Sequence, residues 1–231
     1  MKPGIGQELG REVGRPTARG ITYVLIAVAF FSTSPVLIRY AAPLSPLMIT
    51  FGRLLVAALA VFVMTRLLRR PIELSRADLG KFALYGFITA VHFIFYVSSL
   101  SFTTIAHSLT MVYTSPVFAA IFSAVLLREP IARNKYWGIA LVITGTAILA
   151  GFEPTMTSEM LFGDLLALGA GMTYGLYSAV GRRERGNYPL LTYAFAVYIG
   201  AALWSLPTAT LAIPTEITLG PVLAIVALGI L

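Results

Sequence analysis

Long apolar runs, separated by short polar segments, follow one another along most of the chain. An apolar run of about 20 residues lets an α-helix cross the roughly 30 Å hydrocarbon core of a bilayer. The runs predict seven spans: Ile21 to Tyr40, Leu47 to Leu68, Phe82 to Phe102, Ile105 to Leu127, Tyr136 to Gly151, Leu161 to Val180 and Leu190 to Pro207. An eighth begins near Ile217 and is too short to cross, because about 15 residues reach only about 22 Å. We therefore predict an all-α polytopic membrane protein with about seven and a half helices in this chain, which we interpret as a fragment.

Composition supports the same class. Of the 231 residues, 58% are hydrophobic and only 12% are charged, whereas a soluble domain has about 25% charged residues. So few charged residues cannot cover a soluble surface. The chain has two histidines and no cysteine, which is too few ligands of the kind that a zinc site uses. We expect no metal, no cofactor and no enzymatic activity.

Basic residues lie in alternate polar segments. The N-terminal tail and the segments around residues 66–81, 128–135 and 182–185 hold 15 of the 17 lysines and arginines, and the intervening segments hold none. Because cytoplasmic loops retain Lys and Arg, we predict that residues 1–19 form a cytoplasmic tail. Basic loops beside anionic lipid account for the net charge of +7 without a nucleic-acid partner.

Two segments of the chain share a weak internal similarity. Gly20 to Pro46 and Gly163 to Pro189 have the same length, and the same offset pairs Arg39 with Arg182. Five predicted spans separate the two copies, so the second copy would be inverted in the membrane. We predict a first five-helix repeat at residues 20–151 and an incomplete second repeat at 160–231.

Several motifs resemble a known transporter family. They are Phe31-Ser32-Thr33-Ser34-Pro35 followed by Arg39, Pro46 with Arg53, the stretch from Leu109 to Phe118, Leu127-Arg128-Glu129-Pro130, and Trp137-Gly138 with Gly145. Over the first seven spans, the chain resembles the EamA-type ten-helix transporters of the drug/metabolite transporter superfamily. Phe31 departs from the tryptophan that is common in that family. The resemblance implies an inverted repeat of two five-helix units, and often the export of amino acids or other metabolites.

Polar residues at membrane depth form a stripe on the third predicted helix. Tyr85, Thr89, His92, Tyr96 and Ser99 share one face, and Thr103, His107, Thr110 and Thr114 continue the stripe on the fourth. Polar groups in a membrane are costly and tend to face a cavity or a partner. We expect a solvated path; the alternative is hydrogen bonding between packed helices.

Arg39 and Arg53 are the two basic residues outside the basic segments. We expect Arg39 to extend toward the lipid headgroups. Arg53 lies about 10 Å inside the second helix, where it would face a cavity or helix carbonyls, and its planar guanidinium suits a carboxylate.

Other motifs have a mainly structural interpretation. Pro35 and Pro116 should bend their helices, because proline removes a backbone donor and clashes with the preceding turn. The freed carbonyls and the hydroxyls beside them could bind substrate or permit rocking between two access states; the alternative is a static kink satisfied by neighbouring groups. Gly171 and Gly175 form a G-x-x-x-G that is typical of close helix contact. Glu129 should have a structural role at the end of the fourth helix, where it would interact with Arg133 or with the backbone amides that open the fifth helix.

These observations lead to one functional hypothesis. We predict a secondary carrier in the bacterial inner membrane that exports small metabolites, amino acids first, by alternating access between two inverted halves. The predicted substrate-binding residues are Ser34, Arg53, His92, Tyr96, Thr110 and Tyr174, with His92 a possible proton acceptor. The alternative is a non-transporting scaffold or lipid-binding subunit. Membrane lipids are expected partners, and the choice between monomer and homodimer stays open.

Overall fold

The structure is a computed structural model that describes residues 18–42, 44–128, 133–151, 156–184, 186–211 and 218–230. The chain divides into an N-terminal unit that ends at Ser34 and a main unit, Pro35–Ile230. Residues 1–17 of the predicted 1–19 tail, and Glu129, lie outside the described residues. Each unit is described by itself below.

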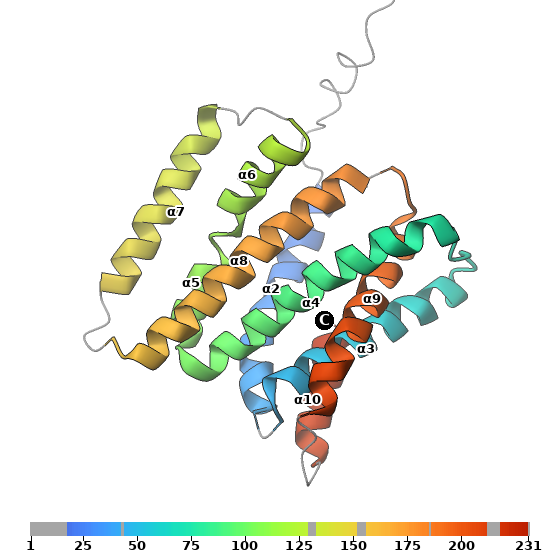
Figure 1. The fold of residues 1–231 in the computed structure, drawn as a ribbon, viewed down its shortest axis with the longest axis horizontal. Coiled ribbons are helices and arrows are strands. Elements are labelled where there is room, and N and C mark those ends of the chain that lie inside the picture. The colour runs from blue at the N-terminus through green and yellow to red at the C-terminus, as the bar shows by residue number, and fades with distance from the viewer. Residues whose placement is uncertain are drawn as a thin grey trace, which may run out of the picture. The chain divides into compact units, whose positions relative to one another are not determined.

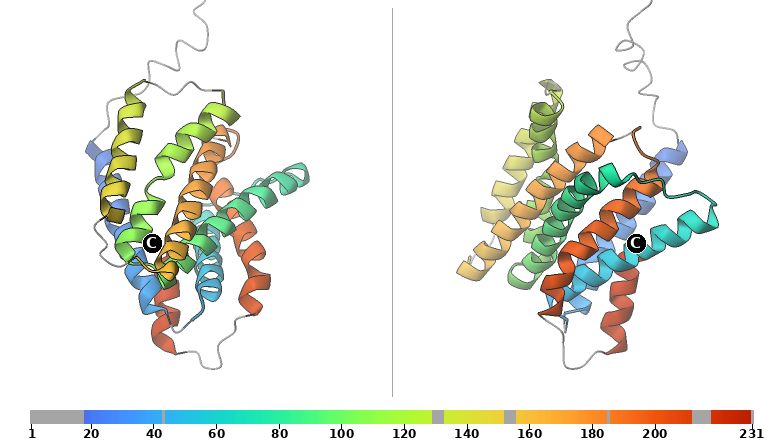
Figure 2. Two further views of the ribbon diagram at one scale, coloured as in Figure 1. Left: turned by 60° about the vertical axis from the view of Figure 1, so that its left-hand side comes forward. Right: turned by 45° about the vertical axis from the view of Figure 1, so that its right-hand side comes forward.

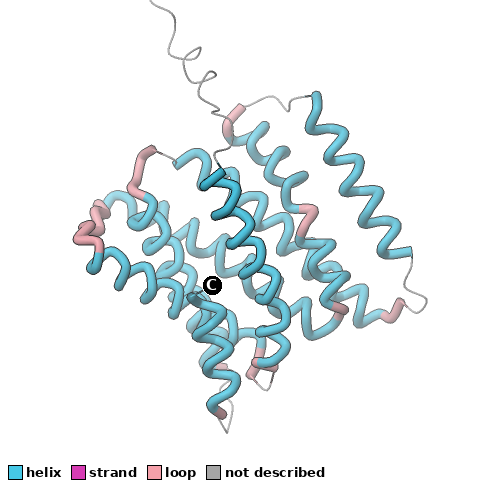
Figure 3. The backbone as a smooth tube through the Cα atoms, turned by 180° about the vertical axis from the view of Figure 1, so that it is seen from behind, coloured by secondary structure: helices cyan, strands magenta, loops and turns pink. Residues whose placement is uncertain are grey.

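Helices account for nearly all of the described chain, and no strand occurs among the residues described (Figure 3). In order they are α2 (Ala18–Tyr40), α3 (Pro46–Leu67), the short 3₁₀ helix η1 (Arg76–Asp78), α4 (Leu79–Phe102), α5 (Ile105–Val112), α6 (Ser115–Leu126), α7 (Arg133–Gly151), α8 (Ser158–Glu184), α9 (Leu190–Thr210) and α10 (Leu219–Ile230). The all-α prediction is confirmed, and a helix occupies each predicted span.

Five helical segments are long and apolar enough to cross a membrane: Gly20–Tyr40, Pro46–Leu67, Arg76–Phe102, Ile105–Leu126 and Leu190–Thr210. Shorter apolar helices occupy Tyr136–Ile148 and Leu219–Ile230. The sixth predicted span falls within α8, which carries charged residues near both ends, among them Asp164 and Glu184. Asp164 and Glu184 are both buried.

Helix boundaries follow local sequence. Ser45 caps α3 by accepting a hydrogen bond from the backbone N–H of Met48 at 3.2 Å, and Pro46 occupies the first turn, where its missing donor costs nothing. Thr104 caps α5 in the same way through the N–H of His107, at 3.2 Å.

The fourth predicted helix is interrupted. Instead of one helix from Ile105 to Leu127, the structure has α5 and α6 with a turn at Tyr113 and Thr114. Pro116 lies in the first turn of α6, so the bend predicted there is confirmed and amounts to a break. The α2 helix continues through Pro35, so no interruption accompanies that proline.

The α4 helix lies at the centre of the main unit's packing, against α8, α9 and α3 (Figure 1). The views in Figure 2 show α4 and α8 side by side along much of their length. At the crossing of α4 with α9, a Cβ added to Gly86 would lie 2.6 Å from the backbone carbon of Gly200. Only glycine permits that approach.

The G-x-x-x-G of α8 also makes a close contact. A Cβ on Gly175 would lie 2.6 Å from the Cβ of Phe118 in α6, and one on Gly171 would lie 2.9 Å from the carbonyl oxygen of Met111. The prediction of close helix contact is therefore confirmed, and Gly171 faces the break between α5 and α6.

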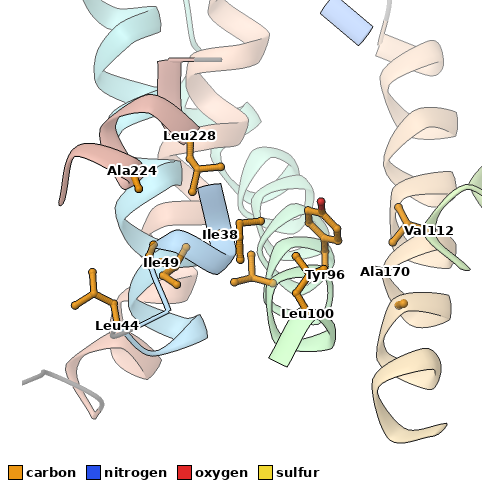
Figure 4. Close-up of a cluster of buried hydrophobic side chains, with 12 residues drawn as sticks. Ile38, Leu44, Ile49, Tyr96, Leu100, Val112, Ala170, Ala224 and Leu228 are labelled. Atoms are coloured by element: carbon orange, nitrogen blue, oxygen red, sulfur yellow. The ribbon is translucent and has the colours of Figure 1, made fainter. Parts of the chain in front are cut away.

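The largest apolar cluster joins several helices of the main unit (Figure 4). Ile38 lies near Ile49, Tyr96 and Leu100, so the end of α2 packs between α3 and α4. Ala224 and Leu228 bring α10 to the same cluster. This packing fixes the spacing of the helices that carry the polar residues described next.

Candidate functional site

Arg53 is the central residue of the candidate site. Its side chain is buried, with 8% of the residue exposed, and its guanidinium carbon lies 4.4 Å from the centroid of the Phe93 ring. Among the described residues, its Nη1 has no hydrogen-bond partner and no carboxylate forms an ion pair with it. A buried cation without an anion is costly, so Arg53 is a candidate for binding an anionic ligand.

Aromatic side chains from two helices lie near this guanidinium. Phe93 and Tyr96 come from α4 and Tyr198 from α9, and both tyrosines are close enough to interact electrostatically with Arg53. The site therefore combines one fixed positive charge with several ring faces. We call Arg53, Phe93, Tyr96 and Tyr198 the Arg53 cluster.

His92 connects the Arg53 cluster to α8. Its Nδ1 lies 2.9 Å from the carbonyl oxygen of Ala170; because a carbonyl only accepts, Nδ1 carries the hydrogen. The ring is parallel to that of Tyr96, with centroids 6.3 Å apart, and lies 5.2 Å from the ring of Tyr174. In the neutral ring, Nε2 keeps its lone pair and can accept a hydrogen bond.

Four of the six predicted site residues thus lie together: Arg53, His92, Tyr96 and Tyr174. Tyr174 is 39% exposed, so it forms a partly open side of the group. The hydroxyl of Thr110 donates to the carbonyl of Ala106 within α5, at 2.8 Å, and is satisfied there. Ser34 belongs to the N-terminal unit, where it is buried and its hydroxyl has no partner among the described residues. A binding role for all six stays a prediction.

The polar stripe of α4 is buried, as its shared face predicted. Much of it forms hydrogen bonds between or within helices: Tyr85 with Glu184, His92 with Ala170, and Ser99 with Ser108, whose hydroxyl oxygens are 2.7 Å apart. These contacts match the alternative interpretation, in which the polar residues form hydrogen bonds between packed helices.

A buried carboxylate lies near the junction of α4 and α5. Asp164 of α8 is 5% exposed; it accepts a hydrogen bond from the Thr103 hydroxyl at 2.7 Å and lies 3.0 Å from Nδ1 of His107. The Nδ1 side of the His107 ring therefore faces Asp164, which fits the alternative of hydrogen bonding between packed helices. Arg39 differs from expectation: its Nη2 donates to the carbonyl of Thr103 at 2.8 Å, so it binds a helix end instead of extending to headgroups.

A second buried carboxylate lies at the opposite end of α8. Glu184 accepts hydrogen bonds from the Tyr85 hydroxyl at 2.7 Å and the Asn187 amide at 2.9 Å, and Lys81 lies 3.8 Å away. Burial by itself raises the pKa of Glu184, but these hydrogen bonds and the charges of Lys81 and Arg183 outweigh it. The pKa of this carboxyl is therefore below its ordinary value.

Sequence reasoning missed the partners of Asp164 and Glu184. Both residues lie near the ends of an apolar run, where charged residues are usually solvated. The order of the residues along the two helices was the one available signal. If α4 and α8 pack antiparallel, Thr103 at the end of α4 lies near Asp164 at the start of α8, and Tyr85 in the first half of α4 lies near Glu184 at the end of α8. Finding it requires knowing that α4 and α8 are neighbours.

Comparisons with known proteins identify the family of this chain. The model of the EamA-like transporter family matches residues 18–151. The chain is similar to the pseudopaline exporter CntI of Pseudomonas aeruginosa, 25% identical over 131 residues, which is 56% of this chain and 45% of that protein. It is also similar to the uncharacterized transporter YyaM of Bacillus subtilis, 23% identical over 181 residues, which is 75% of this chain and 58% of that protein.

The chain is also similar to a solved crystal structure, with a TM-score of 0.66 and 23% sequence identity. The match covers 88% of this chain and 71% of the chain in that structure. That likeness shows the fold. This chain spans about half the length of the two curated relatives. Since the family model matches more than half of the residues, the chain belongs to the EamA-like transporter family, within the drug/metabolite transporter superfamily.

Proposed function

We propose that this protein is a secondary transporter that exports small metabolites bearing a carboxylate, and that Arg53 binds this carboxylate. The observation that carries the proposal is the buried Arg53 guanidinium, which has an unpartnered Nη1 and no described carboxylate beside it. A guanidinium presents parallel N–H donors that match a carboxylate, and such bonds are strong in a site of low polarity.

Amino acids are the first choice of substrate. A zwitterion needs an anion-binding group and a place for its ammonium, and aromatic faces attract ammonium groups. The rings of Tyr96 and Tyr198 belong to the Arg53 cluster, and the ring of Tyr174 lies beside His92. An aliphatic or aromatic side chain of the substrate would contact the same rings.

The other predicted residues have roles that follow from their chemistry. His92 offers Nε2 as an acceptor for a substrate ammonium or a proton. The hydroxyls of Ser34 and Thr110 are further candidate ligands for polar substrate groups. The break between α5 and α6, near Gly171, supplies a place where helix geometry can change during transport.

Transport would follow alternating access. Residues 20–151 and 160–231 would form the two inverted halves, with the N-terminus in the cytoplasm of a bacterium and the protein in its inner membrane. The contacts of α4 with α8 and α9, and of α3 with α9, would then join the two halves. Rocking of one half against the other would expose the Arg53 cluster first to one side and then to the other.

The experiment is overexpression of the intact gene, followed by quantification of amino acids and related metabolites in the medium. We expect one or a few carboxylate-bearing metabolites to accumulate outside, and Arg53→Gln to abolish the accumulation. Arg76→Gln, which removes an exposed arginine in the loop before α4, is the control and should export normally. Unchanged medium across a broad panel would favour the alternative, a non-transporting scaffold or lipid-binding subunit.

A further inference from the structure

A cavity lies where α3 ends, away from the Arg53 cluster. Its volume is about 440 Å³, and its lining includes Phe62, Arg66, Arg70, Ile72 and Phe195. Arg66 is 13 residues after Arg53 on the same helix, which is about 20 Å along its axis. The cavity is therefore separate from the proposed substrate site.

The end of α3 places both arginines at this cavity. The N–H of Arg70 bonds to the carbonyl of Thr65 at 2.9 Å, and the N–H of Arg69 to that of Arg66 at 3.2 Å. This pair of bonds closes a helix through a left-handed residue that is usually glycine. Here the residue is Arg69, with φ of 51°, although a side chain costs about 1 kcal/mol there. The turn brings Arg70 back beside the last turn of α3.

Neither arginine of the cavity is neutralised by a carboxylate among the residues that the structure describes. The guanidinium carbon of Arg66 lies 5.0 Å from the centroid of the Phe62 ring. A guanidinium held over a ring keeps its in-plane N–H donors for an anion. Two such groups at one cavity fit the several acceptor oxygens of a phosphate.

Apart from Thr65, whose hydroxyl donates to the carbonyl of Phe62 at 2.6 Å, the rest of the lining is apolar. The rings of Phe62 in α3 and Phe195 in α9 lie with centroids 5.8 Å apart, and both belong to helices long and apolar enough to span the membrane. The span Pro46–Leu67 ends at this cavity, so the arginines lie at headgroup depth and the rings at the start of the hydrocarbon. Basic pockets between helices on the cytoplasmic face are typical binding places for anionic lipid headgroups.

We propose that this cavity binds one anionic phospholipid, with Arg66 and Arg70 holding its phosphate and with Phe62 and Phe195 contacting the first part of an acyl chain. The site goes beyond the proposed transport function and requires no transport. A soluble phosphate ester shares the phosphate chemistry, but it would leave the aromatic wall unused. The lipid would join α3 to α9, and hence one proposed half to the other.

Native mass spectrometry of the purified full-length protein tests the proposal. Phosphatidylglycerol, phosphatidylcholine with the same acyl chains, and soluble glycerol phosphate are the three ligands. We expect one phosphatidylglycerol to bind at least about tenfold more tightly than phosphatidylcholine, because each arginine contributes about 1 kcal/mol toward an anionic headgroup. Glycerol phosphate should compete weakly.

Two double variants with the same loss of charge separate a built site from general attraction. Arg66→Gln/Arg70→Gln should lose at least about tenfold in affinity for phosphatidylglycerol, whereas Arg76→Gln/Arg183→Gln, outside the cavity, should lose less than about threefold. Arg66→Lys/Arg70→Lys, which keeps the charge, should bind at an intermediate level and reports on folding. Equal losses in the two glutamine variants, or full competition by glycerol phosphate, would overturn the assignment to a lipid.

Discussion

The guanidinium of Arg53 lies over the ring of Phe93, with 4.4 Å from its central carbon to the ring centroid. Arg53 comes from α3 and Phe93 from α4, so the packing of two helices holds the charge in place before any substrate arrives. A fixed donor loses little freedom on binding, which favours affinity. The ring also stabilises the cation without consuming its in-plane hydrogen-bond donors.

Replacing Phe93 should therefore weaken substrate binding. Phe93→Leu keeps an apolar side chain but removes a cation–π contact of about 0.5–2 kcal/mol. We expect the Kd for the transported metabolite to rise by about 2- to 30-fold, measured by calorimetry on the purified protein. Phe162→Leu makes the same change in α8, where the ring contacts Phe102 instead, and should leave the Kd unchanged. Equal effects of the two variants would contradict the role of Phe93.

The crossing of α4 and α9 should tolerate no side chain at Gly86. Gly86→Ala places a Cβ within 2.6–2.8 Å of the backbone of Gly200 and Ala201, and overpacking of this kind typically costs about 1–3 kcal/mol. The variant should unfold at a lower temperature in detergent. Gly138→Ala in α7, where a Cβ meets nothing within 4 Å, should match or exceed the parent, because alanine favours helix. A Gly86→Ala protein as stable as Gly138→Ala would show that the crossing can relax.

Asp164 and His107 should be coupled energetically. Their side chains are buried and 3.0 Å apart, and contacting groups of this kind show coupling energies of about 0.5–3 kcal/mol. A double-mutant cycle with Asp164→Asn and His107→Gln, read by unfolding in detergent, should give a coupling in that range. Additive effects of the two substitutions would mean that the contact contributes nothing to stability.

Stability should depend on the charge of Glu184 with a defined sign. Its pKa is lowered in the folded protein, so its contribution is present above the ordinary carboxyl pKa of about 4.3 and is lost as the pH falls through the lower folded value. Glu184→Gln should therefore unfold at a lower temperature than the parent at pH 7, and the difference should shrink toward pH 3. A difference that stays constant from pH 7 to pH 3 would contradict the assigned shift.

Hydropathy and local chemistry were enough to predict much of the fold. The apolar runs gave helices near the observed ends because membrane thickness fixes their length. Pro116 predicted a bend where the structure has a break between α5 and α6. The spacing of Gly171 and Gly175 predicted a close helix contact. The depth of Arg53 in its span identified it as a candidate for binding.

The networks at the ends of α8 could not be predicted in this way. Whether Asp164 meets Thr103 and His107, or meets water, depends on which helix lies beside α8, and the partners are 57 and 61 residues away in sequence. The partner of Arg39 could not be predicted for the same reason. A long basic side chain near a span end can extend to lipid or bind a free helix carbonyl, and only the neighbouring end of α4 decides between them.

The central claim is that Arg53 binds the carboxylate of the substrate. The most direct test compares the exported metabolite with its uncharged amide, as ligands of the parent and of Arg53→Gln, by calorimetry on the full-length protein. The metabolite should bind at least about 30-fold more weakly to the variant, because losing one partner of a buried charge pair costs about 2–5 kcal/mol, while the amide should bind both proteins alike. A metabolite that binds Arg53→Gln as tightly as the parent would contradict the claim.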